Sequence, residues 1–115
     1  MQDAQRRIDV ARLLFDTTSF YDRVVSNAYY AMYYACRALL ETRGLRPRTH
    51  PAAASLLFHH FVQTGLLPAA QHQNFAHARD MRRRVDYQHH VPTRDEAERL
   101  LNRAQPFVAR ADTLV

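Results

Sequence analysis

The stretch "SNAYYAMYYACRALL", residues 26–40, carries small, aromatic or aliphatic side chains on nearly every face of a helix. One stripe in four-three spacing consists of Val25, Tyr29, Met32, Cys36 and Leu39, and a second consists of Ser26, Tyr30, Tyr33 and Arg37. A helix that is apolar all round must be covered on all sides. We therefore expect a central helix over residues 20–43. Its second stripe then has one of three roles. It lies at the rim of its own bundle, packs against a second copy of the chain, or forms the wall of a nucleotide-sized groove.

The remaining apolar residues repeat at helical spacing, and strand-like alternation is scarce. We expect Asp3 to cap a first helix, and the turn "DTTS" at 16–19 to separate it from the central one. Pro51 and Gly65 are placed to begin and end a third helix. The predicted inward face of that helix consists of Ala54, Leu57, Phe58 and Phe61.

Two further helices are predicted in the second half of the chain. Pro68 opens a fourth helix that Pro92 stops, and "TRDE" at 93–96 has the form of a capping box for a fifth. Pro106 is expected to kink or end that last helix. The inward residues are Phe75, Ala78, Met81 and Val85, followed by Ala97, Leu100, Leu101, Ala104 and Val108. Short connections predict an all-α, antiparallel up-and-down bundle of four to five helices, forming a single domain over residues 1–115.

Composition limits the class of protein. The 115 residues can form one core, and no apolar run is long enough to cross a bilayer. With no signal-peptide pattern at the N-terminus, we expect a cytoplasmic protein. The net charge is +5 and the chain has sixteen arginines but no lysine. The planar guanidinium suits phosphate and favours a nucleic-acid or nucleotide partner, although codon usage in a GC-rich genome would produce the same excess.

The basic stretch "DMRRRVDYQHH", residues 80–90, is the candidate functional segment. Asp80 and Arg84 are four residues apart, as are Arg82 and Asp86, at the spacing that favours ion pairs along a helix. Part of the positive charge is therefore expected to be neutralised within the helix itself.

Histidines and arginines together are a minimal set for cutting RNA without a metal ion. An imidazole can deprotonate the 2′-hydroxyl or protonate the leaving 5′-oxygen, and a guanidinium stabilises charge at phosphorus. His89 and His90 stand just before Pro92, near the expected helix end, and Tyr87 lies one turn beyond Arg83. The alternative is a solvated basic helix end, because cations there complement the helix dipole.

Other kinds of site find little support. Cys36 lies on the apolar stripe, where a buried and inert thiol is the usual state, and one cysteine excludes an intrachain disulfide. His72 and His77 are five residues apart, whereas metal pairs on a helix sit three or four apart. There is also no glycine-rich phosphate loop. We expect no metal and no cofactor.

Four motifs in order resemble one prokaryotic branch of the HEPN family (higher eukaryotes and prokaryotes nucleotide-binding). Residues 26–32 are similar to its Ser-Arg-x-Tyr-Tyr-Ala-Met signature, with Asn27 in place of the arginine. The further matches are Thr49 with His50, Phe61, "TGLLP" at 64–68, and Arg82, Asp86 and Tyr87 in an Arg-x-x-x-Asp-Tyr motif. The resemblance covers about residues 8 to 105.

The resemblance implies a HEPN helical bundle that forms a homodimer through the long helix at 20–43. Many members are metal-independent ribonucleases with an Arg-x(4 to 6)-His motif. Arg84, Arg83 and Arg82 all fit this spacing before His89, so the register is open. Members of the Asp-Tyr branch often lack the nuclease histidine, and some bind only nucleotides or a partner protein.

Many bacterial members are toxins or partners of a small nucleotidyltransferase. In some, that partner silences the toxin by attaching nucleotides to a tyrosine two residues after the motif histidine. Val91 stands at this position, which leaves Tyr87 as the nearby substitute.

Two main hypotheses follow. In the first, the chain is a toxin-like, metal-independent endoribonuclease, homodimeric, in a toxin–antitoxin or nucleotidyltransferase-linked module, with Arg84 and His89 catalytic. In the second, it is a non-catalytic HEPN subunit that binds nucleotide or RNA and docks on a nucleotidyltransferase. A third hypothesis is a simple adaptor bundle. The predicted binding residues are Arg82, Arg83, Asp86, Tyr87, Tyr30, Tyr33 and Arg37.

Overall fold

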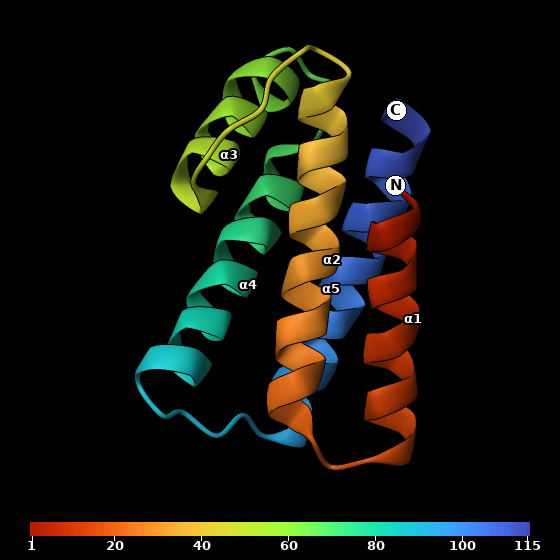
Figure 1. Cartoon of the computed structure of the whole chain (residues 1–115), viewed down its shortest axis with the longest axis vertical. Helices are drawn as coiled ribbons and strands as arrows, with labels where there is room; N and C mark the ends of the chain where they lie inside the picture. Colours follow the sequence, from red (N-terminus) through yellow and green to blue (C-terminus); the bar gives the residue numbers. More distant parts are fainter.

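The computed structural model describes all 115 residues and contains helices but no strands. Four long helices alternate in direction: α1 (Gln2–Thr17), α2 (Tyr21–Glu41), α4 (Ala69–Tyr87) and α5 (Arg94–Leu114) (Figure 1). The short α3 (His50–Leu57) and a π-helical turn (Phe58–Val62) stand between α2 and α4 in the chain. The predicted all-α antiparallel bundle is confirmed.

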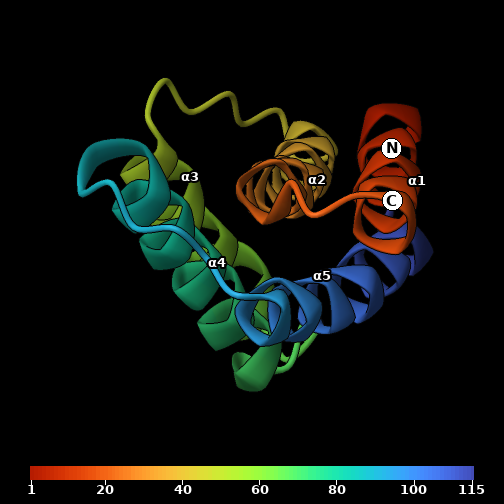
Figure 2. The same ribbon diagram turned by 90° about the horizontal axis from the view of Figure 1, so that it is seen from below.

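Helix α2 is the central element, with α1 on one side and α4 on the other (Figures 1 and 2). Its first predicted stripe is completely buried, and burial raises the pKa of the Cys36 thiol to about 12. Tyr33, from the second stripe, is also buried. The side of α2 that stays open is therefore a strip made of Arg23, Ser26, Asn27, Tyr30, Tyr34, Arg37, Ala38 and Glu41. None of the helices is long and apolar enough to cross a membrane.

The start of α1 differs from the prediction. The helix begins at Gln2 and Met1 occupies the cap position, so Asp3 lies inside the first turn. Its carboxylate still complements the positive end of the helix dipole there. At the next turn, Thr18 Oγ1 accepts a hydrogen bond from the backbone N–H of Phe20 at 3.1 Å, just ahead of α2.

Helix α3 begins as predicted but its inward face is different. Thr49 Oγ1 accepts from the N–H of Ala52 at 3.1 Å, and a proline stands in the first turn. The following turn is π-helical, closed by Gln63 N–H donating to the carbonyl of Phe58. The buried residues Ala53, Leu57 and Phe61 are four apart and share one face, which leaves Phe58, predicted to face inward, 37% exposed.

At the ends of α4 and α5, the predicted capping box is confirmed, and the helix ends that were predicted from two prolines are corrected. Thr93 Oγ1 accepts from Glu96 N–H at 3.1 Å, and the Glu96 carboxylate accepts from Thr93 N–H at 3.0 Å, so the capping box is present. Helix α4 ends at Tyr87, well before Pro92, because the chain turns at His89. Pro106 does not end α5, which continues to Leu114. Pro106 lies on the exposed side, where the carbonyl that it leaves unpaired can meet water.

We expect Leu39→Ala to lower the free energy of unfolding by about 2–5 kcal/mol, because Leu39 is fully buried in α2 and truncation leaves a cavity. The control is Leu13→Ala, since Leu13 is 62% exposed and should change stability by less than about 0.5 kcal/mol. Urea denaturation measures both. Equal losses would contradict a core built around α2.

Candidate functional site

Helix geometry sends the three consecutive arginines of α4 in different directions, because successive residues are about 100° apart. Arg82 turns toward α2, and its Nη2 donates a hydrogen bond to the Tyr30 hydroxyl at 2.9 Å. Its Nε lies 2.8 Å from Asp86 Oδ2. The N–H is not aimed at that oxygen, so the contact is an ion pair rather than a hydrogen bond. The predicted pair of Arg82 with Asp86 is confirmed, whereas Asp80 and Arg84 make no ion pair.

Aromatic rings surround the Arg82 guanidinium. Its central carbon lies 5.2 Å from the ring centroid of Tyr30 and 5.8 Å from that of Tyr29. Both distances are within the range of cation–π attraction. Because only 18% of the Arg82 side chain is exposed, this cation is held between α4 and α2 rather than presented to solvent.

The imidazole of His50 extends the same cluster. It stacks on Tyr33 with ring centroids 4.0 Å apart and planes 9° apart. Its Nδ1 is hydrogen-bonded to the Tyr29 hydroxyl. Burial raises the pKa of that hydroxyl, so it keeps its proton and donates it. We therefore assign Nδ1 as the acceptor and place the ring proton on Nε2.

The charge state of His50 follows from its surroundings. Burial, followed by the nearby positive charges of Arg82 and Arg79, lowers the pKa of His50 below its ordinary value. A neutral ring is what the Tyr29 hydrogen bond requires. Neither His50 nor Tyr29 was predicted to be a site residue, although Thr49 and His50 had matched a motif. Nothing in a linear sequence shows that these two rings meet.

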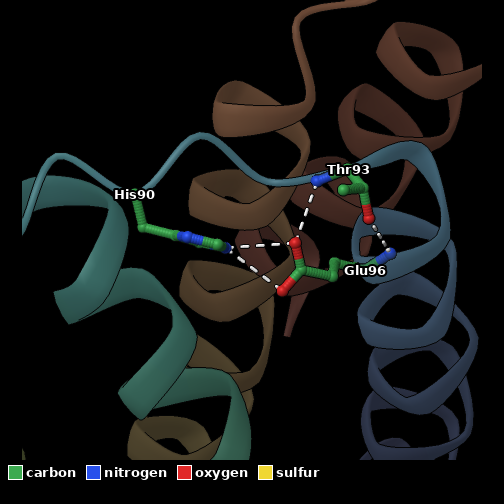
Figure 3. Close-up of polar contacts among 3 residues, drawn as sticks. All are labelled: His90, Thr93 and Glu96. Atoms are coloured by element: carbon green, nitrogen blue, oxygen red, sulfur yellow. Dashed lines mark hydrogen bonds and ion pairs between the residues drawn. The ribbon is translucent and has the colours of Figure 1, made fainter.

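The two histidines that follow the arginines are in different situations. His90 Nε2 lies 3.1 Å from both carboxylate oxygens of Glu96 (Figure 3). An ionised carboxylate only accepts, so His90 is the donor. The Thr93 backbone N–H, and then His90, lower the pKa of Glu96. One carboxylate thus caps α5 and restrains His90, a second use that the capping-box motif did not reveal.

His89, in contrast, is exposed and makes no side-chain hydrogen bond. Its φ of 53° is in the left-handed region, and no other non-glycine residue of the chain has a positive φ. It lines a surface hollow together with Ser19, Tyr21 and Asp22, from the turn between α1 and α2 and the start of α2.

The structure separates the predicted site residues into groups. Tyr30, Tyr33, Arg82 and Asp86 belong to the cluster between α2 and α4, and Arg37 stands 5.9 Å from the Tyr33 ring centroid. Arg83, Arg84 and Tyr87 line a hollow at the end of α4. His89 lines the separate hollow described above. The predicted catalytic pair, Arg84 and His89, therefore does not share a hollow within one chain.

Residues 1–114 of this helical bundle match the HEPN domain model. This protein belongs to the HEPN family. The family predicted from the four motifs is confirmed.

Several relatives of this HEPN protein are also similar over most of its length. It is 30% identical over 107 residues to a protein of Methanocaldococcus jannaschii named "Putative toxin", covering 93% of this chain and 79% of the relative. A second protein of that organism with the same designation is 28% identical over 109 residues, covering 94% and 74%. A UPF0332 protein of Gloeobacter violaceus is 36% identical over 87 residues, covering 76% and 68%.

We expect Tyr30→Phe to destabilise the fold by about 1 kcal/mol, because the partly buried Arg82 guanidinium loses its hydroxyl acceptor. Tyr34→Phe is the matched control, since the Tyr34 hydroxyl makes no hydrogen bond within the chain and the residue is on the same helix. The comparison is made by urea denaturation. Equal effects would mean that the hydroxyl of Tyr30 does not hold α4.

We also expect two separate pH windows of stability. The folded pKa of His50 lies below the ordinary 6.5, so the unfolded chain takes up the proton first as the pH falls. Its contribution is complete above about pH 6.5 and is lost as the pH falls through the folded value. Glu96 has a pKa below the ordinary 4.5, so its contribution is complete above that value and is lost in more acidic solution.

Urea denaturation of wild type, His50→Gln and Glu96→Gln at a series of pH values measures how stability depends on pH. Between about pH 7.5 and pH 5.5, wild type and Glu96→Gln should lose stability, whereas His50→Gln should lose less. Below about pH 4.5, Glu96→Gln should respond less than wild type. If the free energy of unfolding of His50→Gln fell with pH as steeply as that of wild type, the assignment of a neutral His50 ring bonded to Tyr29 would be refuted.

Proposed function

We propose that this HEPN protein is a toxin-like endoribonuclease that cuts RNA without a metal ion and acts as a homodimer. The observation that carries the proposal is His89, an unrestrained imidazole beside the arginine-bearing end of α4. Two relatives named as toxins support the class of function. An associated antitoxin or nucleotidyltransferase belongs to the same proposal.

The backbone at His89 supports a functional role. A left-handed conformation costs a non-glycine residue roughly 1–2 kcal/mol, and glycine is the usual residue at such a helix end. The turn is closed by the N–H groups of Gln88 and His90, which both donate to the carbonyl of Arg84 at 3.1 Å. A strained position that is occupied by a reactive side chain points to function rather than to stability.

The chemistry needs a base, an acid and a cation. One imidazole would take the proton of the 2′-hydroxyl, a second would protonate the leaving 5′-oxygen, and a guanidinium would stabilise the charge at phosphorus. Of the two histidines that follow the arginines, His90 is restrained by Glu96, so this segment of each chain supplies one free imidazole, His89. Two chains together supply both. We propose that they pair along the open strip of α2 and that Arg84, with Arg83, binds the phosphate.

The decisive variant is His89→Gly, which removes the imidazole and suits the left-handed backbone at the same time. We expect RNA cleavage in the presence of EDTA to fall by at least about 100-fold, which is the usual contribution of an acid–base group. The free energy of unfolding should stay equal or rise, because glycine relieves the strain. A labelled RNA on a denaturing gel and urea denaturation measure the two quantities.

His59→Ala is the control, since His59 is an exposed histidine on the π-helical turn and should leave cleavage unchanged. Arg84→Gln should also reduce cleavage, with the fold intact. Full activity in His89→Gly, or activity that disappears with EDTA, would exclude this mechanism.

The second candidate is a non-catalytic HEPN subunit that binds nucleotide or RNA and docks on a nucleotidyltransferase. Two observations favour it: Arg82 is hydrogen-bonded to Tyr30 and ion-paired with Asp86, and Arg84 and His89 line different hollows. Intact RNA and ordinary growth on induction, together with tight nucleotide binding, would support this candidate over the nuclease.

A further inference from the structure

The guanidinium groups of half of the sixteen arginines make a hydrogen bond, ion pair or cation–π contact within the chain, and those of the other half make none. The arginines without a hydrogen bond, ion pair or cation–π contact are Arg6, Arg23, Arg48, Arg79, Arg83, Arg84, Arg99 and Arg103. Four of these eight line two surface hollows that involve α4 and α5. Half of the arginines without a partner therefore lie at these two hollows.

The two hollows are neighbours that share two lining residues, Asp80 and Arg84. The first lies between α4 and α5 and is lined by Arg84 from α4 and by Arg99 and Arg103 from α5, with Asp80 beside them. The second lies at the end of α4 and is lined by Asp80, Arg83, Arg84 and Tyr87. Because Asp80 and Arg84 line both, the four arginines form a row of cations that leads from α5 to the end of α4. In Figure 1, the end of α4 and the start of α5 are joined by the loop at the bottom of the molecule.

Two carboxylates, Asp80 and Glu96, line the first hollow and neutralise the charge of its three arginines only in part. The Glu96 carboxylate is held by His90 and by the N–H of Thr93, and Asp80 makes no ion pair. Arg99 and Arg103 are four residues apart on α5 and therefore lie on the same face, where like charges repel. An external anion would remove this repulsion.

A single aromatic ring stands at one end of this row of cations. The Tyr87 side chain is 70% exposed and makes no aromatic contact within the chain. A groove of cations that ends at an open ring is the arrangement by which proteins hold single-stranded nucleic acid, with phosphates on the cations and a base on the ring. His89 follows Tyr87 by two residues, so a strand held in this way would arrive at the proposed nuclease histidine.

We infer that the hollows lined by Arg103, Arg99, Arg84 and Arg83 form a track for the backbone of single-stranded RNA, ending with a base stacked on Tyr87. The inference rests on the proposed function, because it names how the RNA reaches His89. It assigns RNA contacts to Arg99 and Arg103, which the family motifs do not include. Asp80 is the carboxylate on the track that makes no ion pair, and its negative charge weakens the binding of RNA there.

The test is binding of a labelled, unstructured single-stranded RNA to the full chain carrying His89→Gly, which prevents cleavage during the measurement. We expect Arg99→Gln with Arg103→Gln to weaken binding about tenfold and to reduce the slope of log affinity against log salt by about 1.4, as for two lost phosphate contacts. Asp80→Asn should strengthen binding. Tyr87→Ala should weaken binding without changing the salt slope.

The matched control is Arg6→Gln with Arg48→Gln, which removes the same charge from α1 and from the loop before α3. Binding that falls equally in both double variants would overturn the track, because only net charge would then matter. If the protein neither binds nor cleaves single-stranded RNA at all, the proposed function itself fails. If wild type cleaves RNA and the Arg99 and Arg103 variants bind it normally, only the track fails.

Discussion

The contact between Arg82 and Tyr30 fixes the rotation of α4 about its own axis, and the rest of the site depends on that rotation. Arg82 is held against the rings of α2 and paired with Asp86. Its two neighbours are then about 100° and 200° away around the helix. Arg83 and Arg84 consequently point away from α2, and Arg84 reaches the hollow beside α5. One anchored guanidinium leaves two others available to a ligand.

Much of the fold could be predicted because its rules are local. The apolar stripe of α2 follows from helical spacing, and the capping box at 93–96 follows from two residues three positions apart. The errors came where tertiary structure replaced a local preference. The buried face around α3 follows Ala53, Leu57 and Phe61 and leaves Phe58 outward, and a left-handed residue ended α4 before Pro92. Asp3 is not the cap because the helix extends to the start of the chain.

The candidate site was less predictable, because it depends on which way each side chain points. Composition could count the arginines but could not say which are paired. The Arg82 pair with Asp86 was found from spacing, while the same spacing predicted a pair of Asp80 with Arg84 that does not form. The contact of His50 with Tyr29 joins residues 21 positions apart, and no local pattern reveals it.

Glu96 has a dynamic consequence as well as a static one. Its carboxylate joins the first turn of α5 to the segment 88–93 through Thr93 and His90 (Figure 3). That segment therefore cannot swing as an independent flap, because its displacement also uncaps the helix. Displacement of the segment 88–93, which contains His89, and fraying of the first turn of α5 are therefore one cooperative event. Its timescale is that of local unfolding, which is slower than the motion of a free loop.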